Sequence, residues 1–467
     1  MESCRGLHHL VMNIMAKASL LLSVCLLVAS SSASSFSKPN PTSKLRLQQV
    51  LVVHRHGDRS PITPLKDEDF WQSQLPQPHV LEGIAKGTAL VRPPEGNPIH
   101  GAHGRGPFGQ LTMMGVLQMA SLGERLREEL QDTLFTDEKP LHPSRMRIMS
   151  TDFPRTIQSV QALLTGLFEG AQLDAPAIQI DVRRTNSYLI PDPQPRQTPT
   201  QLVLESHLAK RPHLVEKEKE LNELAHKVTD ALQDHLGEGA MGVSFGIGEE
   251  KSQDDDDIDG MKKKKKPLAW AKLAEILTCL HSRDLLPPTL SKEDVEQVNK
   301  HVAWRWFENL SHPVLAKSAM WKFANKMVED MEHKVECVKR EDESTGEEHI
   351  EEPLLCIYSA HDSTLIGLLC VLQLEQPESW PEYGSYLKAE LIQEEKDGDS
   401  KEVLQHWVRF SLNGQVLRST WTDEPADMVP LSELSEMIHS EHDIYCEHTG
   451  SKLFTWKNGA LVHTQSQ

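Results

Sequence analysis

The sequence predicts an α/β fold, a three-layer sandwich with a mostly parallel central sheet and an inserted helical cap domain. Short apolar segments typical of strands alternate with helical patterns near both ends of the chain. The middle of the chain is instead rich in charged helical patterns. Its 467 residues suffice for one large core or for two domains. We therefore expect an α/β domain from residues 47–184 and 340–467, and a mainly helical cap from residues 185–339.

The first half of the α/β domain is expected to begin with a strand near Leu47–Val53, an apolar run that is typical of a buried strand. Residues 62–108 are rich in proline and glycine and lack periodicity, so we expect long loops there. Leucines at helical spacing predict a helix from Thr112 to Leu126. The remaining elements expected in this half are the strand Met146–Met149, the helix Phe153–Phe168 and the strand Ile178–Val182.

The second half of the domain resumes the alternation after the cap. The expected elements are the strand Leu354–Ser359, the helix Ser363–Leu372, the strands Tyr386–Ile392 and Trp407–Leu412, and the short helix Leu431–His439. Within the cap, Asp254–Asp257 is followed closely by Lys262–Lys266. Opposite charge blocks this close are typical of solvated segments, so a disordered insertion is expected near residues 249–266.

The N-terminus has the pattern of a secretory signal. Lys17 precedes an apolar run, Ala18–Ala29, and small residues follow it with a cleavage site expected near Ala33. We expect a signal peptide over residues 1–34 and a linker over residues 35–46, and Met15 is an alternative start. The run is too short to span a bilayer, so no stable membrane span is expected after signal removal. The predicted location is extracellular or in a lysosomal or vacuolar lumen, and an uncleaved membrane anchor is the alternative.

Charge and cysteine content narrow the classes of partner. The chain carries 68 acidic and 49 basic residues, a net charge of −19. This balance argues against nucleic acid as a partner, because neutralising phosphates along a strand needs clustered lysine and arginine. Outside the targeting segment there are five cysteines, so at most two disulfides can form. Cys356 and Cys370 lie in apolar runs and are expected to be buried thiols.

The segment Val52–Pro61 carries the strongest functional signal. A buried strand ends in Arg55-His56-Gly57, and Arg59 follows at once. Guanidinium groups bind phosphate oxygens in pairs, and an imidazole among them can act as a nucleophile. His54 and His56 would share one strand face, so a metal pair is an alternative. The adjacent arginines disfavour it, because they repel a cation.

Two further segments follow predicted strands. Ser359–Thr364 contains His361 and Asp362 at the start of a helix, where anions are favoured, although this pair can also be a simple helix cap. Ser150–Thr156 contains Arg155 in the first turn of the next helix, with Asp152 as its expected cap. Ligands gather at the carboxyl ends of strands in open α/β sheets, so all three segments are expected to meet there.

The three segments together resemble the signature of the histidine acid phosphatases, in the acid phosphatase and phytase branch of the histidine phosphatase superfamily. The resemblance implies that the chain hydrolyses phosphomonoesters with His56 as nucleophile and Asp362 as proton donor. It further implies a phosphate clamp of Arg55, Arg59, Arg155 and His361. It implies no cofactor and no metal, and HExxH and CxxC ligand patterns are absent from the sequence.

The chain looks most like the lysophosphatidic acid phosphatase type within this family. Gly109-Gln110-Leu111-Thr112, Leu122–Leu126 and Trp380-Pro381 carry that likeness. Phytases of the family tend to have asparagine where Thr364 stands, although a phytase-like inositol phosphate phosphatase stays an alternative. A catalytically idle phosphate-binding or interaction protein on the same fold is the other. The complete set of six site residues favours the enzyme, and the sequence leaves the oligomeric state open.

The chemistry implied is a two-step transfer through a phosphohistidine. Neutral His56 attacks phosphorus, while the clamp stabilises the charge on the equatorial oxygens. Asp362 must be protonated to assist the leaving alkoxide, which a carboxyl with an ordinary pKa of about 4 does most readily at low pH. Ionised Asp362 then activates water to hydrolyse the intermediate.

Overall fold

The computed structural model describes residues 44–93, 104–135, 141–168, 178–183, 211–242, 266–310, 312–343, 353–395, 405–422, 425–445, 452–457 and 460–463. All of these residues belong to one compact unit. The predicted signal peptide, and all of the predicted charged insertion except Lys266, lie outside the described residues.

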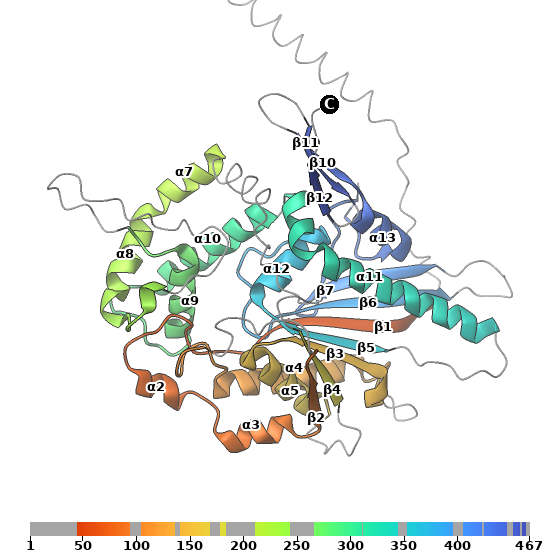
Figure 1. Cartoon of the computed structure of the whole chain (residues 1–467), viewed down its shortest axis with the longest axis horizontal. Helices are drawn as coiled ribbons and strands as arrows, with labels where there is room; N and C mark the ends of the chain where they lie inside the picture. The colour runs from red at the N-terminus through yellow and green to blue at the C-terminus, as the bar shows by residue number, and fades with distance from the viewer. Residues whose placement is uncertain are drawn as a thin grey trace, which may run out of the picture. The chain divides into compact units, whose positions relative to one another are not determined.

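A mixed sheet of nine strands forms the centre of the described part of the chain, in the order β2-β4-β3-β5-β1-β6-β7-β8 with β9 paired to β7 (Figure 1). The strands β2, β4, β3, β5 and β1 are parallel, and β6 to β9 pair antiparallel. Their bounds are β1 Lys44–Arg55, β2 Thr88–Val91, β3 Met146–Thr151, β4 Ile178–Arg183, β5 Leu355–Ala360, β6 Tyr386–Glu395, β7 His406–Leu412, β8 Gln415–Leu417 and β9 Val429–Pro430. The predicted α/β class is confirmed, and the parallel part of the sheet is the half that carries the three sequence motifs.

Helices cover both faces of the sheet (Figure 1). One face is covered by α3 (Pro78–Ala85), α4 (Met113–Leu130) and α5 (Pro154–Leu167). The other is covered by α11 (Pro313–Glu343), α12 (Asp362–Val371) and α13 (Leu431–His439). Successive residues of β1 alternate between the two cores, because side chains on a strand point to opposite faces.

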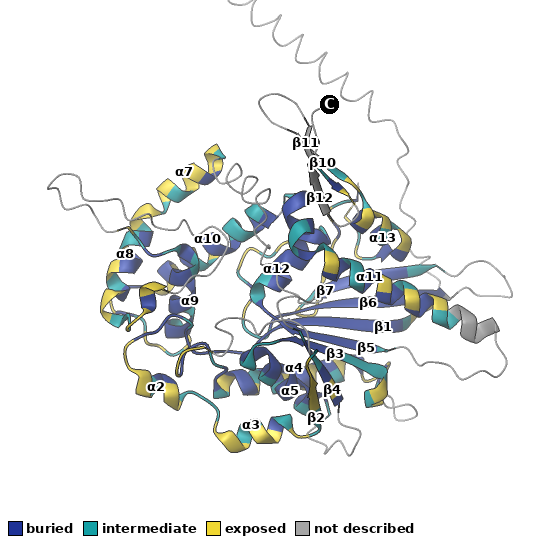
Figure 2. Ribbon diagram, in the orientation of Figure 1, coloured by how far each residue is buried: buried dark blue, intermediate teal, exposed yellow. Residues whose placement is uncertain are grey.

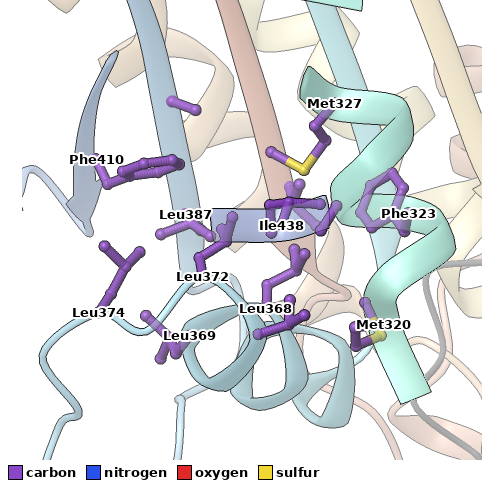
Figure 3. Close-up of a cluster of buried hydrophobic side chains, with 14 of the residues drawn as sticks. Met320, Phe323, Met327, Leu368, Leu369, Leu372, Leu374, Leu387, Phe410 and Ile438 are labelled. Carbon is purple, nitrogen blue, oxygen red and sulfur yellow. The ribbon is translucent and has the colours of Figure 1, made fainter. Parts of the chain in front are cut away.

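The core beneath α11 and α12 is the larger of the two. In Figure 3, Met320, Phe323 and Met327 of α11 face Leu368 and other leucines of the α12 region, with Phe410 and Ile438 beside them. The strand β5 is buried along its length, and β1 is buried from Gln48 to Arg55 (Figure 2). A rigid sheet buried on both faces is a suitable support for side chains that must be held at its edge.

A second group of helices forms the cap. These are α7 (Pro212–Glu220), α8 (Asn222–Leu232), α9 (Trp270–His281) and α10 (Lys292–Leu310). Buried side chains of α8, α9 and the first half of α10 form a separate core, to which Leu65, Trp71 and Phe108 from the first part of the chain contribute. Trp71 belongs to α2 (Glu68–Ser73), so the segment after the first motif is packed against the cap. Three-residue 3-10 helices lie at Pro143–Arg145, Gln233–His235 and Ala240–Gly242.

Several elements differ from the sequence-based expectation. Residues 62–108 contain α2, α3 and the edge strand β2 instead of loops alone, and β2 is mostly exposed, so it lacks the apolar pattern of a buried strand. A small sheet of β10 (His442–Tyr445), β11 (Lys452–Lys457) and β12 (Ala460–His463) was also not predicted. Helix α11 begins inside the range assigned to the cap, yet its apolar side packs on the sheet.

The predicted state of two cysteines is confirmed. Cys356 and Cys370 are buried free thiols, as predicted, and Cys279 is also a buried free thiol. Within the described ranges, every helix is too short or too polar to cross a bilayer.

Candidate active site

The three motifs meet because their strands are neighbours. The strands β3, β5 and β1 are adjacent and parallel, with Arg55 in register with Ala360 and Ser150 in register with Ser359. The residues that follow these strands therefore come out at one edge of the sheet. His56, His361 and Arg155 reach the site in this way, as predicted from the sequence.

Gly57 allows the first motif to pack tightly on the next helix. A side chain at Gly57 would place its Cβ only 2.5 Å from the carbonyl oxygen of Gly115 in α4. The N–H of Asp58 donates to the side-chain oxygen of Gln118 at 2.8 Å. Glycine is needed here for close backbone approach rather than for a left-handed turn.

His56 is held as a neutral imidazole. It is 2% exposed, and its Nδ1 lies 2.8 Å from the carbonyl oxygen of Gly57. A carbonyl can only accept, so Nδ1 carries the proton and Nε2 keeps its lone pair. Burial, together with the positive charges of Arg155, Arg55 and Arg59, holds the pKa of His56 well below its usual value. A buried, unprotonated Nε2 has the form that a nucleophile requires.

Asp362 is paired with Arg55. The Asp362 Oδ2 atom lies 2.8 Å from Arg55 Nη2 and accepts a hydrogen bond from the Trp380 indole at 3.0 Å. Its Oδ1 accepts the backbone N–H of Ser363 at 2.8 Å. Burial raises the pKa of this carboxyl, but Arg55 and then Trp380 outweigh burial and lower it below its usual value. The side chain of Asp362 is nevertheless 22% exposed, so it is open to solvent or substrate.

Arg59 is paired with a carboxylate from the cap. Its Nη1 donates to Glu275 Oε1 at 2.8 Å. The Nε atoms of both Arg55 and Arg59 are buried and have no hydrogen-bond partner among the described residues. Buried donors are normally satisfied, and two unused guanidinium donors in one site fit an oxyanion.

His361 and Arg155 complete the site. His361 Nε2 lies 3.1 Å from the hydroxyl of Thr151, and its ring centroid is 5.7 Å from that of His56. Arg155 lies over the ring of Phe153, with the guanidinium carbon 4.4 Å from the centroid, and it is buried. Burial and the charge of Arg155 lower the pKa of His361 to about 3. The charge of Arg155 thus lowers the pKa of both histidines.

The start of α5 differs from the sequence-based expectation. Asp152 does not cap α5: the N-cap is Phe153, which has no side-chain cap, and the carboxylate of Asp152 pairs with Arg92 at 3.3 Å. The proline at the start of α5 already removes one unpaired N–H, so less capping is needed.

Among the described residues, no three His, Cys, Asp or Glu side chains gather as a metal site.

Sequence reasoning missed three residues at the site. The ring of Tyr383 lies 4.1 Å from the guanidinium carbon of Arg55 and 5.7 Å between centroids from His56. Glu275 binds Arg59, and Arg283 binds Asp58. These residues have no local motif, because each meets the site only through the fold. Trp380-Pro381 was noticed as a likeness, although the indole bond to Asp362 was not foreseen.

Comparisons with known proteins agree with this geometry. Residues 46–413 match the family model of the histidine phosphatase superfamily (branch 2). It is 26% identical to counting factor 60 of Dictyostelium discoideum over 436 residues, which cover 86% of this chain and 88% of that protein. It is 33% identical to lysophosphatidic acid phosphatase type 6 of Bos taurus over 168 residues, which cover 33% of this chain and 39% of that protein. The solved phytase of Citrobacter braakii shares its fold, with a TM-score of 0.52 at 15% identity, covering 84% of this chain and 97% of the other.

Proposed function

The chain belongs to the histidine phosphatase superfamily (branch 2) and is a phosphomonoester hydrolase of the acid phosphatase kind, and on this premise we propose that His56 is the nucleophile and Asp362 the proton donor. The observation that carries the proposal is the state of His56. Its Nδ1 is tied to the carbonyl of Gly57, its pKa is depressed, and three guanidinium groups surround it. A neutral nucleophile beside a cationic oxyanion site fits phosphoryl transfer.

The first half of the reaction forms a covalent intermediate. Nε2 of His56 uses its lone pair to form a bond to phosphorus, and the bond from phosphorus to the leaving oxygen breaks. The electron pair stays on that oxygen, which takes a proton from Asp362. Arg55, Arg59, Arg155 and His361 hold the equatorial oxygens, where the charge of the transition state is spread. In the second half, ionised Asp362 takes a proton from water and the water oxygen forms a bond to phosphorus. The bond from phosphorus to Nε2 of His56 breaks, its electron pair returns to that nitrogen, and phosphate is released.

Asp362 must gain a proton before it can donate one. In the free site Arg55 lowers its pKa. A phosphate dianion that takes donors of Arg55 adds negative charge beside the carboxyl, and this raises the pKa of Asp362. Substrate binding and low pH therefore act in the same direction, which is the reason to expect an acid optimum.

Lysophosphatidic acid is the substrate that we propose. Support comes from the similarity to lysophosphatidic acid phosphatase type 6 and from the Gly109–Thr112 and Leu122–Leu126 segments. A phytase-like activity is the second candidate, because the phytase of Citrobacter braakii shares the fold. On the N-terminal pattern, we also propose a secreted or lumenal location.

Two experiments test this function. The purified chain should be quenched in acid during turnover of a 32P-labelled phosphomonoester, and the label should be found on a histidine that peptide mapping identifies as His56. Label on an aspartate or a serine would exclude the proposed nucleophile. A panel containing lysophosphatidate, phytate, glycerol phosphate and 4-nitrophenyl phosphate should show the highest kcat/KM for lysophosphatidate, and preference for phytate would overturn the substrate proposal.

A further inference from the structure

One face of the cap helix α9 is directed at the first motif. Glu275, Cys279 and Arg283 are spaced four residues apart, so they follow one line along the helix and its C-terminal extension. Glu275 Oε1 lies 2.8 Å from Arg59 Nη1, and Cys279 Sγ lies 4.0 Å from the same nitrogen. Arg283 Nη2 lies 2.5 Å from Asp58 Oδ2. Two consecutive residues of the motif are therefore each bound by α9.

Both ion pairs are buried. The side chains are 6% and 4% exposed in the Arg59–Glu275 pair, and 4% and 1% exposed in the Arg283–Asp58 pair. Each pair joins residues more than 200 positions apart in the chain. Burying two charges costs desolvation energy that offsets their attraction, so these pairs fix geometry more than they add stability.

We propose that Glu275 is a positioning residue that orients Arg59 for the transition state of phosphoryl transfer. The inference rests on the proposed function, in which Arg59 binds the transferring phosphoryl group. A guanidinium is planar and rigid, so holding Nη1 on Glu275 also sets the direction of Nε, which has no partner among the described residues. The same carboxylate oxygen accepts the backbone N–H of Ile62, so it also holds the chain just after the motif.

A positioning role has a signature that mere structural support lacks. The negative charge of Glu275 competes with phosphate for Arg59, so it weakens ground-state binding of an anion while it improves alignment. Removing the charge should therefore leave phosphate affinity unchanged or tighter and should lower kcat. General damage to the site would instead weaken phosphate binding and turnover together.

The test compares Glu275→Gln with the full unaltered chain, using 4-nitrophenyl phosphate as substrate and inorganic phosphate and vanadate as inhibitors. We expect kcat to fall about tenfold to a hundredfold, the range that misalignment within a site produces. The inhibition constant of phosphate should stay the same or fall, and that of vanadate, which resembles the transition state, should rise. Glu218→Gln is the matched control, because Glu218 is a cap carboxylate paired with Arg305 away from the motif.

A second set of variants separates this inference from the proposed function. Arg59→Lys and the double variant should show non-additive losses of kcat, since the proposed effect of Glu275 on turnover passes through Arg59. If Arg59→Lys leaves kcat and phosphate inhibition unchanged, the clamp itself is wrong. If Arg59→Lys impairs turnover but Glu275→Gln behaves as Glu218→Gln does, the positioning role is wrong. Should Glu275→Gln not fold, Glu275→Asp keeps the charge and shortens the side chain, and positioning predicts a lower kcat with unchanged phosphate inhibition, whereas an unaltered kcat refutes it.

Discussion

Two carboxylates bind arginines of the first motif. One comes from the central sheet, which we call the sheet side of the site, and the other comes from the cap helices, which we call the cap side. Asp362 binds Arg55 and Glu275 binds Arg59, both at 2.8 Å. The Asp362 side chain is 22% exposed, whereas that of Glu275 is 4% exposed. Equal ion pairs can therefore have unequal roles, because only a carboxyl that substrate or solvent can reach is able to exchange a proton during turnover.

The two carboxylates also differ in what supports them. Asp362 begins α12 directly after the buried strand β5, so the central sheet sets its position. Glu275 belongs to α9, whose buried side chains lie in the separate core of the cap. In the proposed mechanism the sheet side supplies the reacting groups, and the cap side supplies an alignment that depends on how the cap packs.

The largest expected effect comes from the sheet side itself. His56→Ala removes the proposed nucleophile, so we expect kcat to fall by roughly 10⁴- to 10⁶-fold. The residue is at the strand end rather than in an apolar core, and the variant should remain folded by circular dichroism. Steady-state rates on 4-nitrophenyl phosphate measure the loss. A variant that keeps a tenth of the activity would place the nucleophile elsewhere.

The comparison between the two carboxylates becomes sharpest when the leaving group is varied. Asp362→Asn keeps the shape but removes the transferable proton, so alkyl phosphates should lose about a hundredfold to ten-thousandfold in kcat/KM. Nitrophenyl phosphate should lose much less, because its leaving group is a weak base. Glu275→Gln should instead slow both substrates by the same factor. Equal losses for both substrates in Asp362→Asn would reduce Asp362 to an orienting residue.

A smaller effect is expected when Arg155 keeps its positive charge but loses the planar guanidinium group. Arg155→Lys retains a cation but cannot hold two oxygens in one plane, and loss of a transition-state donor typically costs about a hundredfold. Both alkyl and nitrophenyl phosphates should be affected equally, with kcat/KM as the measurement. Arg92→Lys, which alters an arginine paired with Asp152 outside the clamp, is the matched control. Equal behaviour of the two variants would remove Arg155 from the clamp.

The sequence predicted the sheet side well and the cap side poorly, for a physical reason. His56, Arg155 and Asp362 lie shortly after the ends of strands, so short segments carry both their chemistry and their position. The family resemblance that these segments indicated is confirmed. Glu275 and Arg283 meet partners more than 200 residues away, and a charged residue on a helix gives no sign of such a partner. Helix α2 escaped for a similar reason, since Trp71 packs against the distant cap, whereas the edge strand β2 is mostly exposed and lacks an apolar pattern.

The sheet side should also make the fold sensitive to acid, and His54 gives the most direct test. Burial lowers the pKa of His54 to about 4 from an ordinary value of 6.5. Between these two pH values the unfolded chain binds a proton that the native protein does not, so the free energy of unfolding falls as the pH falls from 6.5 to 4, and levels off below 4. The loss approaches about 1.4 kcal/mol for each pH unit, or about 2 kcal/mol between pH 6.5 and 4.5.

His54→Asn should therefore show a difference between urea midpoints at these two pH values that is smaller than in the unaltered chain. His79→Asn, at an exposed histidine of α3, serves as the matched substitution and should keep the full difference. If both variants keep the full difference between urea midpoints, the native protein accommodates a charged His54. Water then reaches this side chain more readily than its burial implies.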